Sequence, residues 1–137
     1  MEILIRKRIS TDLPFIFDSW MKSWRISKWA GTIPNHLYFE TQRVLIEDLI
    51  ARGAWIVVAY PTGQLDTIIG WACCEQKDDK CVLHYVYVKD PYMNLGVVEK
   101  LLDALPGRKP GYLTHKIGVK ELKEWRHTPE MARRKDL

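Results

Sequence analysis

The chain has 137 residues and a formal net charge of +4, and its length fits one domain with one sizeable core. Apolar residues make up 47% and charged residues 28%, which is the balance of an ordinary globular protein and excludes a disordered or fibrous one. No apolar run approaches the roughly 20 residues that a membrane span requires, and the first residues lack the order of a signal peptide. We therefore expect a cytoplasmic protein that forms a single domain over residues 1–137.

The three cysteines are Cys73, Cys74 and Cys81. An odd number of cysteines without C-x-x-C spacing argues against both a disulfide framework and a zinc site. The simplest interpretation is that they are three small hydrophobic side chains in a reducing compartment. We therefore expect no bound metal.

The basic residues are concentrated late in the chain. They are Arg108, Lys109, Lys116, Lys120, Lys123, Arg126, Arg133, Arg134 and Lys135. A basic surface attracts nucleic acid or an anionic cofactor, but no nucleic-acid recognition motif accompanies this charge. We expect a basic tail over about residues 126–137, either extended or disordered, and no nucleic-acid partner.

The first part of the sequence predicts a strand followed by a helix. Residues Glu2–Ile9 alternate and are rich in isoleucine, as is typical of a short strand. Ser10–Asp12 then offer N-cap oxygens, and Pro14 fits the first helical turn. The apolar residues that follow recur at three- and four-residue spacing and predict a helix of about four turns. They are Leu13, Ile16, Phe17, Trp20 and Trp24.

A second helix is predicted from Asn35 or His36 to Ala51, after an irregular stretch that contains Gly31 and Pro34. Its predicted apolar face includes Leu37, Val44, Leu45 and Leu49, with Phe39 and Ile50 as further candidates. Gly53 follows at the place where many helices end in a left-handed residue.

Three strands are predicted next. Ala54–Tyr60 is a continuous apolar run, which is typical of a strand buried on both faces. Thr67–Glu75 predicts a second strand, in which Gly70 indicates a bulge or a close backbone approach. Cys81–Val88 predicts the third, joined to the second through a polar hairpin turn at Lys77–Lys80.

A helix and a strand complete the predicted elements. The helix runs from about Leu95 to Leu105, and a turn that includes Lys109–Gly111 leads to a strand at Tyr112–Ile117. Val119–Trp125 fits either a short helix or the approach to a last strand. This order predicts an α+β fold with α/β/α layers, in which helices flank a mixed, mostly antiparallel sheet. The last strand–helix–strand unit should be a right-handed parallel crossover.

The point where the predicted strand Cys81–Val88 leads into a helix is suited to binding an anion. A helix start leaves backbone N–H groups unpaired and carries partial positive charge, which favours phosphate. We expect the N–H groups of Asn94–Val98 to hold such a group, with Gly96 allowing close backbone approach. The alternative is a helix that only packs beside a strand.

The same residues resemble the acetyl-CoA signature of the GNAT (acyl-CoA N-acyltransferase) superfamily. In that signature a strand ending in V-x-P-x-Y leads into R/Q-x-x-G-x-G/A and a helix that contains Leu-Leu. The positions that match in spacing are Val88, Tyr92, Gly96, Leu101 and Leu102, while Pro91 is one place late. The opening residues Ile5–Pro14 are also similar to the usual first strand and helix start. The chain most resembles small GNAT-like proteins of tailed bacteriophages, which implies the host cytoplasm as its location.

The resemblance implies acetyl-CoA as co-substrate, bound where the strand before the loop splays from its parallel neighbour. Backbone groups of Tyr87, Val88 and Lys89 would then pair with the pantetheine arm. The resemblance also assigns the cofactor's pyrophosphate to the loop amides. Those amides belong to Asn94, Leu95, Gly96, Val97 and Val98, next to Met93.

The chain departs from the family pattern at three places. Met93 stands where the family has Arg or Gln, which removes one polar contact to the cofactor. Val98 replaces the second small residue, and its branched Cβ crowds the phosphate position. The family's C-terminal helix often carries a tyrosine that protonates the departing thiolate, but no tyrosine follows Tyr112 here.

Acyl transfer to an amine needs a base for the ammonium proton and donors for the developing oxyanion. We expect the base to be His84, near the thioester, or Glu75, at the end of the preceding strand. Strand alternation predicts that His84 faces away from Tyr85 and Tyr87, either of which could act as donor or acid. Each of these residues also has a simpler interpretation as a packed or solvated side chain.

Three tryptophans, Trp20, Trp24 and Trp29, lie in the region that shapes the acceptor pocket in GNAT-like folds. They fit either a pocket wall or the core. His115 and His127 have no partner that the sequence identifies.

The resemblance implies an acetyl-CoA-dependent N-acetyltransferase with direct transfer to a small-molecule or peptide amine beside the first two helices. Met93, Val98 and the missing tyrosine favour an alternative, a GNAT-like module that no longer catalyses and acts through binding, for example in a phage protein. A short C-terminus would leave a sheet edge open, which would allow a homodimer.

Overall fold

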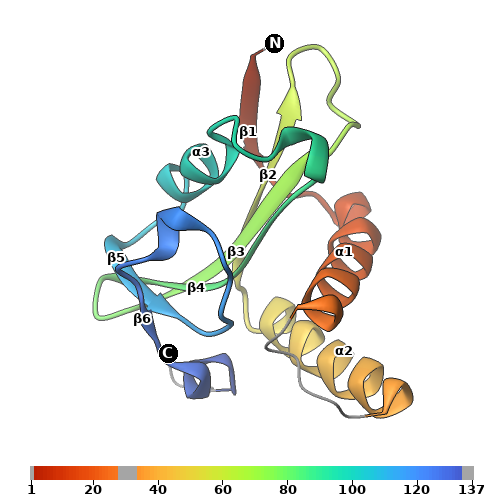
Figure 1. Ribbon diagram of the computed structural model, residues 1–137, viewed down its shortest axis with the longest axis vertical. Coiled ribbons are helices and arrows are strands. Elements are labelled where there is room, and N and C mark those ends of the chain that lie inside the picture. The colour runs from red at the N-terminus through yellow and green to blue at the C-terminus, as the bar shows by residue number, and fades with distance from the viewer. Residues whose placement is uncertain (1, 28–33, 134–137) are drawn as a thin grey trace.

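The computed structural model describes residues 2–27 and 34–133 (Figure 1). The strands are β1 (Ile3–Lys7), β2 (Trp55–Pro61), β3 (Gly70–Lys77), β4 (Lys80–Val88), β5 (Arg108–Leu113) and β6 (Arg126–His127). The helices are α1 (Leu13–Ile26), α2 (Asn35–Ala51) and α3 (Val97–Asp103). Short 3-10 turns lie at Ser10–Asp12, Asp90–Tyr92, Lys120–Leu122 and Pro129–Arg133. No helix in the described parts of the chain is long and apolar enough to cross a membrane.

The six strands form one mixed sheet in sequence order. β1 to β4 pair antiparallel, whereas β4 with β5 and β5 with β6 pair parallel. Helices α1 and α2 lie on one side of the sheet and α3 on the other, as Figure 1 shows. The α/β/α layering and the parallel unit β4–α3–β5 confirm the predicted fold class.

Each face of the sheet has its own apolar core. The core under α1 and α2 includes Ile16, Trp20, Leu49, Val58 and Trp71. The core under α3 includes Val57, Leu83, Val86, Val97 and Leu101. Because neighbouring residues of β2 enter opposite cores, both of its faces are buried, which explains its continuous apolar run.

A β-bulge interrupts the pairing of β3 with β4. Cys73 pairs with Tyr85 and Cys74 with Leu83, so His84 has no partner residue in β3. The extra residue reverses the alternation of side chains along β4. As a result His84 and Tyr85 both face the α1 and α2 side, and the prediction that they face opposite ways is wrong. The bulge also lies at this point and not at Gly70.

Strands β4 and β5 are paired only over the first half of β4. Their last register pair is Leu83 with Leu113, followed by a bond from the Thr114 N–H to the Leu83 carbonyl at 3.0 Å. No residue from Tyr85 to Val88 has a partner in β5. The strands therefore diverge beyond Leu83, which gives the splayed strand that the family resemblance implies.

Two elements near this gap differ from their predicted bounds. α3 begins at Val97 and not at Leu95, because Asn94 and Gly96 have left-handed φ values of 66° and 78° that a helix cannot include. β5 occupies residues 108–113, so it includes the predicted turn at Lys109–Gly111 and only the first two residues of the strand predicted at Tyr112–Ile117. Pro110 fits there because β6 pairs only with Tyr112 and Leu113, which leaves the strand edge at Pro110 open.

The C-terminal residues up to 133 are folded, which corrects the prediction of an extended or disordered tail over residues 126–137. β6 pairs with β5, and the following 3-10 turn buries Met131 and Ala132, which are 5% and 3% exposed. The guanidinium of Arg52, the residue that follows α2, holds this turn by donating to the Ala132 carbonyl at 2.9 Å. The rest of the expected tail lies outside the described residues.

The buried face of α2 differs from the predicted one. Leu37, Phe39 and Val44 are exposed by 45%, 40% and 60%, so their assignment to the apolar face is wrong. The buried residues follow helical spacing and include two polar-tipped side chains that apolarity alone does not reveal. They are Tyr38, Gln42, Leu45, Ile46 and Leu49.

The ends of α1 and α2 are fixed in different ways. Gly53 ends α2 with φ 87°, while its N–H donates to Ile50 and that of Ala54 to Leu49, which confirms the predicted left-handed cap. Asp12 does not cap α1 through its side chain. Its carboxylate instead accepts from the Ile9 N–H at 2.8 Å and from Arg6 at 2.8 Å.

Candidate functional site

The open half of β4 offers backbone groups from only some of the predicted residues. The Lys89 N–H donates to the Ile69 carbonyl at 2.9 Å, so Lys89 is committed to the β3 side. Successive residues of an antiparallel strand direct their N–H and C=O groups to opposite sides, so residues two apart direct them to the same side. The backbone groups of Tyr87 therefore face β3, like those of Lys89. Val86 and Val88 direct theirs toward the gap. The backbone groups of Val86 and Val88 are thus open toward the gap, whereas those of Tyr87 and Lys89, which the family resemblance assigns to the cofactor, are directed toward β3.

Gly70 holds β3 close to this half of β4. A Cβ atom at Gly70 would lie 2.7 Å from the Tyr87 carbonyl oxygen and 3.3 Å from Cγ2 of Val88. Only glycine fits such an approach without moving backbone, which confirms the predicted close contact. The position of β4 at the gap therefore depends on the absence of a side chain here.

A cavity of about 190 Å³, the loop cavity, lies at the open end of the gap. One wall is the loop after β4 and the other is a segment near the C-terminus. The residues that line it are Val88, Tyr92, Met93, Asn94, Gly96, Val97, Val98, Gly118, Val119, Lys120 and Glu121. Among the described residues no backbone carbonyl accepts from the N–H groups of Asn94, Leu95 or Gly96. Such N–H groups in a loop of left-handed residues suit an anion.

Met93 and Val98 occupy different environments. Met93 is 36% exposed and lines the loop cavity, to which it presents an apolar side chain. Val98 is 8% exposed and packs in the core under α3 as well as against the cavity. Leu95, by contrast, is 57% exposed and does not line the cavity. The far wall, Gly118 to Glu121, was not predicted, because nothing in its sequence indicates that it folds back over the loop.

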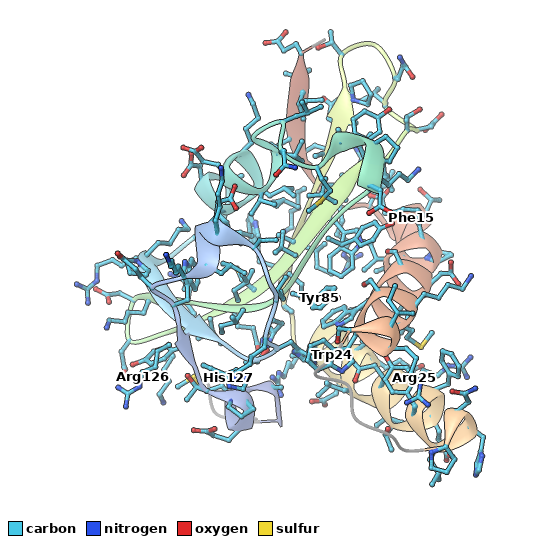
Figure 2. All side chains as sticks on the ribbon, in the orientation of Figure 1. Phe15, Trp24, Arg25, Tyr85, Arg126 and His127 are labelled. Carbon is cyan, nitrogen blue, oxygen red and sulfur yellow. The ribbon has the colours of Figure 1, made fainter. Side chains whose placement is uncertain are left out.

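A second cavity of about 760 Å³, the helix groove, follows one face of α1. Its walls come from α1, the start of α2, and the end of β4 with the turn after it. The residues that line it are Phe15, Asp18, Ser19, Lys22, Ser23, Arg25, Ile26, Asn35, Phe39, Tyr87, Lys89, Asp90 and Pro91. In Figure 2 Phe15 lies near the start of α1 and Arg25 near its end, while Tyr85 lies between the helix and the sheet.

The aromatic residues divide between the helix groove and the core. Trp20 is fully buried and stacks on Tyr85 with ring centroids 5.4 Å apart, and Trp24 contacts the edge of the same ring. Neither tryptophan lines the helix groove. Phe15 and Tyr87 do line it, so they supply the aromatic wall that the tryptophans were expected to give. Trp29 lies outside the described residues.

Tyr85 and Tyr87 differ in access. The Tyr85 hydroxyl pairs with Oγ of Ser23 at 2.9 Å, and burial raises the pKa of this phenol. Burial also raises the pKa of Tyr87, with Asp90 and Asp18 adding to the effect. Tyr87 faces the groove directly, whereas Tyr85 reaches it only through Ser23, which lines it.

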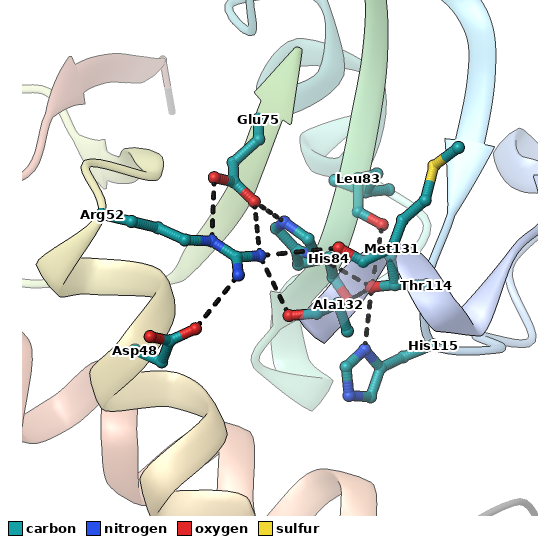
Figure 3. Close-up of polar contacts among 9 residues, drawn as sticks. All are labelled: Asp48, Arg52, Glu75, Leu83, His84, Thr114, His115, Met131 and Ala132. Atoms are coloured by element: carbon teal, nitrogen blue, oxygen red, sulfur yellow. Dashed lines mark hydrogen bonds and ion pairs between the residues drawn. The ribbon is translucent and has the colours of Figure 1, made fainter. Parts of the chain in front are cut away.

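The two predicted bases are bonded to each other. Nε2 of His84 lies 2.7 Å from Oε1 of Glu75, and Nδ1 of His84 lies 3.0 Å from Oγ1 of Thr114 (Figure 3). Burial lowers the pKa of His84. The same effect would raise the pKa of Glu75, but the hydrogen bonds from His84 and Arg52 outweigh it and hold the pKa below its ordinary value. A neutral His84 that donates to an ionised Glu75 satisfies both shifts.

His84 and Glu75 line neither the loop cavity nor the helix groove. His84 is 0% exposed, so the expectation that it meets the thioester is not supported by its position. It is instead part of a buried polar network that joins α2, β3, β4 and the C-terminal turn. The members of this network that the sequence did not reveal are Asp48, Arg52, Thr114 and His115.

Arg52 is the central donor of the buried polar network. It donates to both carboxylate oxygens of Glu75, at 3.1 Å and 2.9 Å, and to Asp48 at 3.0 Å, while it also binds the carbonyl of Ala132. At the other end the Thr114 hydroxyl lies 3.0 Å from Nδ1 of His115. The network satisfies buried charges mutually, which is the condition under which such charges are stable.

The three cysteines line neither the loop cavity nor the helix groove. Cys73, Cys74 and Cys81 are buried free thiols, and burial raises the pKa of Cys73. Within the described residues no group of three or more His, Cys, Asp or Glu side chains is placed to hold a metal ion.

No protein-family model matches the sequence, and no curated protein matches it. Solved structures do match the fold. PaiA N-acetyltransferase from Thermoplasma acidophilum, in complex with coenzyme A, aligns with a TM-score of 0.56 and 22% identity over 74% of this chain and 68% of that one. A GNAT-family acetyltransferase from Brucella melitensis in complex with acetyl-CoA aligns at 0.53 and 19%, over 74% and 64%.

A ribosomal-protein-alanine N-acetyltransferase from Brucella melitensis aligns at a TM-score of 0.51 and 21% identity, over 73% of this chain and 62% of that one. The chain thus spans less than two thirds of the length of both Brucella proteins. The six-stranded mixed sheet with its three helices has the fold of the GNAT acetyltransferases.

Proposed function

We propose that this chain is an acetyl-CoA-dependent N-acetyltransferase. The single observation that carries the proposal is the gap between β4 and β5 beyond Leu83, with the loop cavity at its open end. The fold is that of GNAT acetyltransferases, and two similar structures hold coenzyme A or acetyl-CoA. These facts support the co-substrate, while the chemistry below comes from this chain's own residues.

The proposed site places the cofactor's phosphate end at the loop cavity and its acyl end deeper in the gap. The N–H groups of Asn94, Leu95 and Gly96 face no backbone acceptor among the described residues and are available to phosphate oxygens. Val86 and Val88 offer strand hydrogen bonds to the pantetheine amides. The gap closes at Leu83 and Thr114, so an arm that enters at Val88 brings its acyl end to the level of Tyr85.

Acetyl-CoA supplies a thioester carbonyl carbon that an amine attacks. The amine lone pair forms the new C–N bond, the C–S bond breaks, and its electron pair leaves with sulfur. The nitrogen then loses its excess proton to water in the helix groove, and the thiolate gains one from a donor that the same water reprotonates. Tyr85 lies at the level of the acyl group and its hydroxyl connects through Ser23 to the helix groove, so we assign it as the proton donor to the thiolate. His84 and Glu75 position this part of β4 and touch no reactant.

Titration of the protein with acetyl-CoA tests the proposal. A ligand at about 100 times its Kd adds about 2.7 kcal/mol to the free energy of unfolding, which a thermal-unfolding scan detects. Calorimetry should give one site per chain, and desulfo- or dephospho-analogues should bind more weakly. If millimolar acetyl-CoA left the unfolding temperature unchanged, the proposal that this chain is an acetyl-CoA-dependent enzyme would be wrong.

Met93 and the lack of a tyrosine after Tyr112 favour the alternative, a GNAT-like module that acts by binding and no longer catalyses. A turnover assay distinguishes the enzyme from the binding module. The enzyme should release free thiol from acetyl-CoA when an acceptor is supplied, whereas the module should not, even where it binds the cofactor.

A further inference from the structure

His115 lies at the closed end of the gap between β4 and β5, across from Tyr85. The last register pair of the two strands is Leu83 with Leu113, so Tyr85 and His115 each lie two residues further along the chain. Their ring centroids are 6.0 Å apart, in an edge-to-face arrangement. An acyl group at the level of Tyr85 would therefore have His115 on its β5 side.

We infer that His115 is the proton acceptor of the proposed acetyl transfer, and that the Glu75 carboxylate fixes its tautomer through His84 and Thr114. The inference rests on the proposed function for its reaction. The chain of hydrogen bonds that fixes the tautomer does not depend on that reaction, because it is part of the fold.

The hydrogen bonds between Glu75 and His115 run in one direction (Figure 3). Nε2 of His84 lies 2.7 Å from a carboxylate oxygen of Glu75, which also accepts from Arg52. An ionised carboxylate only accepts, so the neutral His84 carries its proton on Nε2 and has a lone pair on Nδ1. This Nδ1 atom and Nδ1 of His115 both lie 3.0 Å from Oγ1 of Thr114.

The Thr114 hydroxyl has one proton, so it donates to one acceptor at a time. Nδ1 of His84 has no proton of its own and takes this one. Nδ1 of His115 must then donate to Thr114, which leaves the lone pair of a neutral His115 on Nε2. Donation by the hydroxyl to the carbonyl of Leu83 or His84, at 3.5 Å and 3.4 Å, would require the same of His115. The Gln42 amide nitrogen, a donor 3.5 Å from Nε2 of His115, agrees with a lone pair there.

The ring of His115 lies on the side of the sheet that α1 and α2 cover. Trp20 and Trp24 of α1 contact it at centroid distances of 5.8 Å and 4.9 Å, and Gln42 reaches it from α2. Tyr85 is the titratable group that faces it from β4. These four described neighbours are uncharged at neutral pH, so a neutral imidazole suits these surroundings before the reaction.

The buried polar network also stabilises His115 once it has taken up a proton. The Nδ1–H of the imidazolium remains at the start of the chain that ends on the Glu75 carboxylate. The network contains two carboxylates, Asp48 and Glu75, and one cation, Arg52. A proton on His115 therefore balances the charge of the network, which is the condition under which buried charges are stable.

The proton balance of the reaction closes between His115 and Tyr85. When the amine forms the C–N bond, the proton that its nitrogen passes to water moves on to Nε2 of His115. The C–S bond breaks with its electron pair on sulfur, and the thiolate takes the proton of Tyr85. The imidazolium then returns its proton through the same water to the Tyr85 oxygen, so each turnover leaves both residues as they were.

Nuclear magnetic resonance of protein with ¹⁵N-labelled histidine tests the chain, because two-bond ¹H–¹⁵N correlations report the tautomer of each imidazole. At pH 7.5 His115 should be the Nδ1–H tautomer and His84 the Nε2–H tautomer. Thr114→Val removes the acceptor of Nδ1 and should convert most of His115 to the Nε2–H tautomer. Thr128→Val is the matched control, since that hydroxyl donates to the Arg126 carbonyl, and should leave both tautomers unchanged. An Nε2–H tautomer of His115 in the wild type would overturn the inference.

Addition of acetyl-CoA to the labelled protein tests the position of His115. The ring signals of His115 should shift, while those of His36, which is exposed on α2 and outside both cavities, should not. Bound cofactor that leaves His115 unchanged would remove the proton acceptor and keep the proposed function. Failure of the cofactor to bind would instead remove the proposed function, and the tautomers would still measure the chain.

Turnover of two small amines tests the catalytic role. Ethylamine and hydrazine are similar in size, but hydrazine is much the weaker base and loses a proton to water far more readily. His115→Gln should therefore lower kcat/KM about a hundredfold with ethylamine and less than about tenfold with hydrazine. Equal losses with both amines, or a loss with neither, would contradict the inference.

Discussion

Nε2 of His84 lies 2.7 Å from Oε1 of Glu75, and the imidazole is completely shielded from solvent. Arg52 holds the other side of the carboxylate, and Thr114 holds the other ring nitrogen. Two residues whose chemistry suggested catalysis are thus bound to each other at the bulge of β4. Their effect on function passes through the geometry of that strand.

Acid should weaken the fold through His84. Burial lowers its pKa below 6.5, so between that value and the folded-state pKa the unfolded chain binds a proton that the folded chain does not. The free energy of unfolding should therefore fall as pH drops below 6.5. The lowered pKa of Glu75 adds a further loss below pH 4.5. Urea unfolding at a series of pH values measures both.

His84→Asn should lower stability at pH 7.5 by about 2 kcal/mol, because it removes the buried imidazole that bonds both Glu75 and Thr114. Its stability should also change less between pH 6.5 and pH 5 than that of the wild type. His36→Asn, at an exposed position of α2, serves as the control and should retain the wild-type pH dependence. An unchanged slope in His84→Asn would contradict the assignment.

Arg52→Met should destabilise the protein by about 3 kcal/mol, because it leaves the partly buried Glu75 carboxylate without its cation. It also releases the Ala132 carbonyl, so limited proteolysis should cut first near the C-terminal turn. Arg108→Met removes a guanidinium whose ion pair with Asp79 is 68% exposed on each side, and it should change stability by less than about 1 kcal/mol. Similar losses of stability in both variants would argue against the buried polar network as the group that holds the C-terminal turn.

Met93→Arg should tighten acetyl-CoA binding. A charged hydrogen bond to phosphate is worth about 1.5–3 kcal/mol, which is about ten- to a hundredfold in Kd. Leu65→Arg adds the same charge at an exposed position outside both cavities and should alter Kd by less than threefold. Calorimetry at low and high salt measures both variants. Weaker binding by Met93→Arg would show that the loop does not hold the phosphate.

Tyr85→Phe should lower kcat by about a hundredfold while it leaves KM for acetyl-CoA nearly unchanged, if its hydroxyl supplies the proton to the thiolate. The loss should be smaller with a thioester whose thiol is more acidic, because that thiolate leaves without a proton. Tyr112→Phe, in β5 and outside both cavities, is the control. A full loss that persists with the acidic thiol would indicate a structural effect.

Periodicity and turn chemistry revealed most of the fold. The local conformational preference of a segment is visible in the sequence where tertiary packing agrees with it. Examples are the apolar run of β2, the adjacent aspartates between β3 and β4, and Gly53. The bulge at His84 could not be predicted from the sequence. An extra residue leaves the composition of a strand typical and changes only the face of the sheet on which each side chain lies. That one residue reversed the predicted orientation of His84 and joined it to Glu75.

The part of the site formed by residues close together in the sequence was predictable. The part formed by residues from distant segments was not. Six of the residues assigned to the cofactor from the local sequence line one cavity, and their binding role stays a prediction: Val88, Met93, Asn94, Gly96, Val97 and Val98. Gly118 to Glu121 and Arg52 contribute through long-range contacts that no spacing encodes. The C-terminal turn likewise depends on a guanidinium 80 residues earlier, so composition alone made it look like a tail.

One continuous segment, residues 114–133, begins at the closed end of the gap, forms the far wall of the loop cavity and ends under Arg52. A molecule held in that cavity therefore restrains a segment whose other end is fastened to α2. By thermodynamic linkage, ligand occupancy should slow amide hydrogen exchange in the C-terminal turn, far from any atom of the ligand. Loosening the turn should in the same measure weaken the ligand's equilibrium affinity.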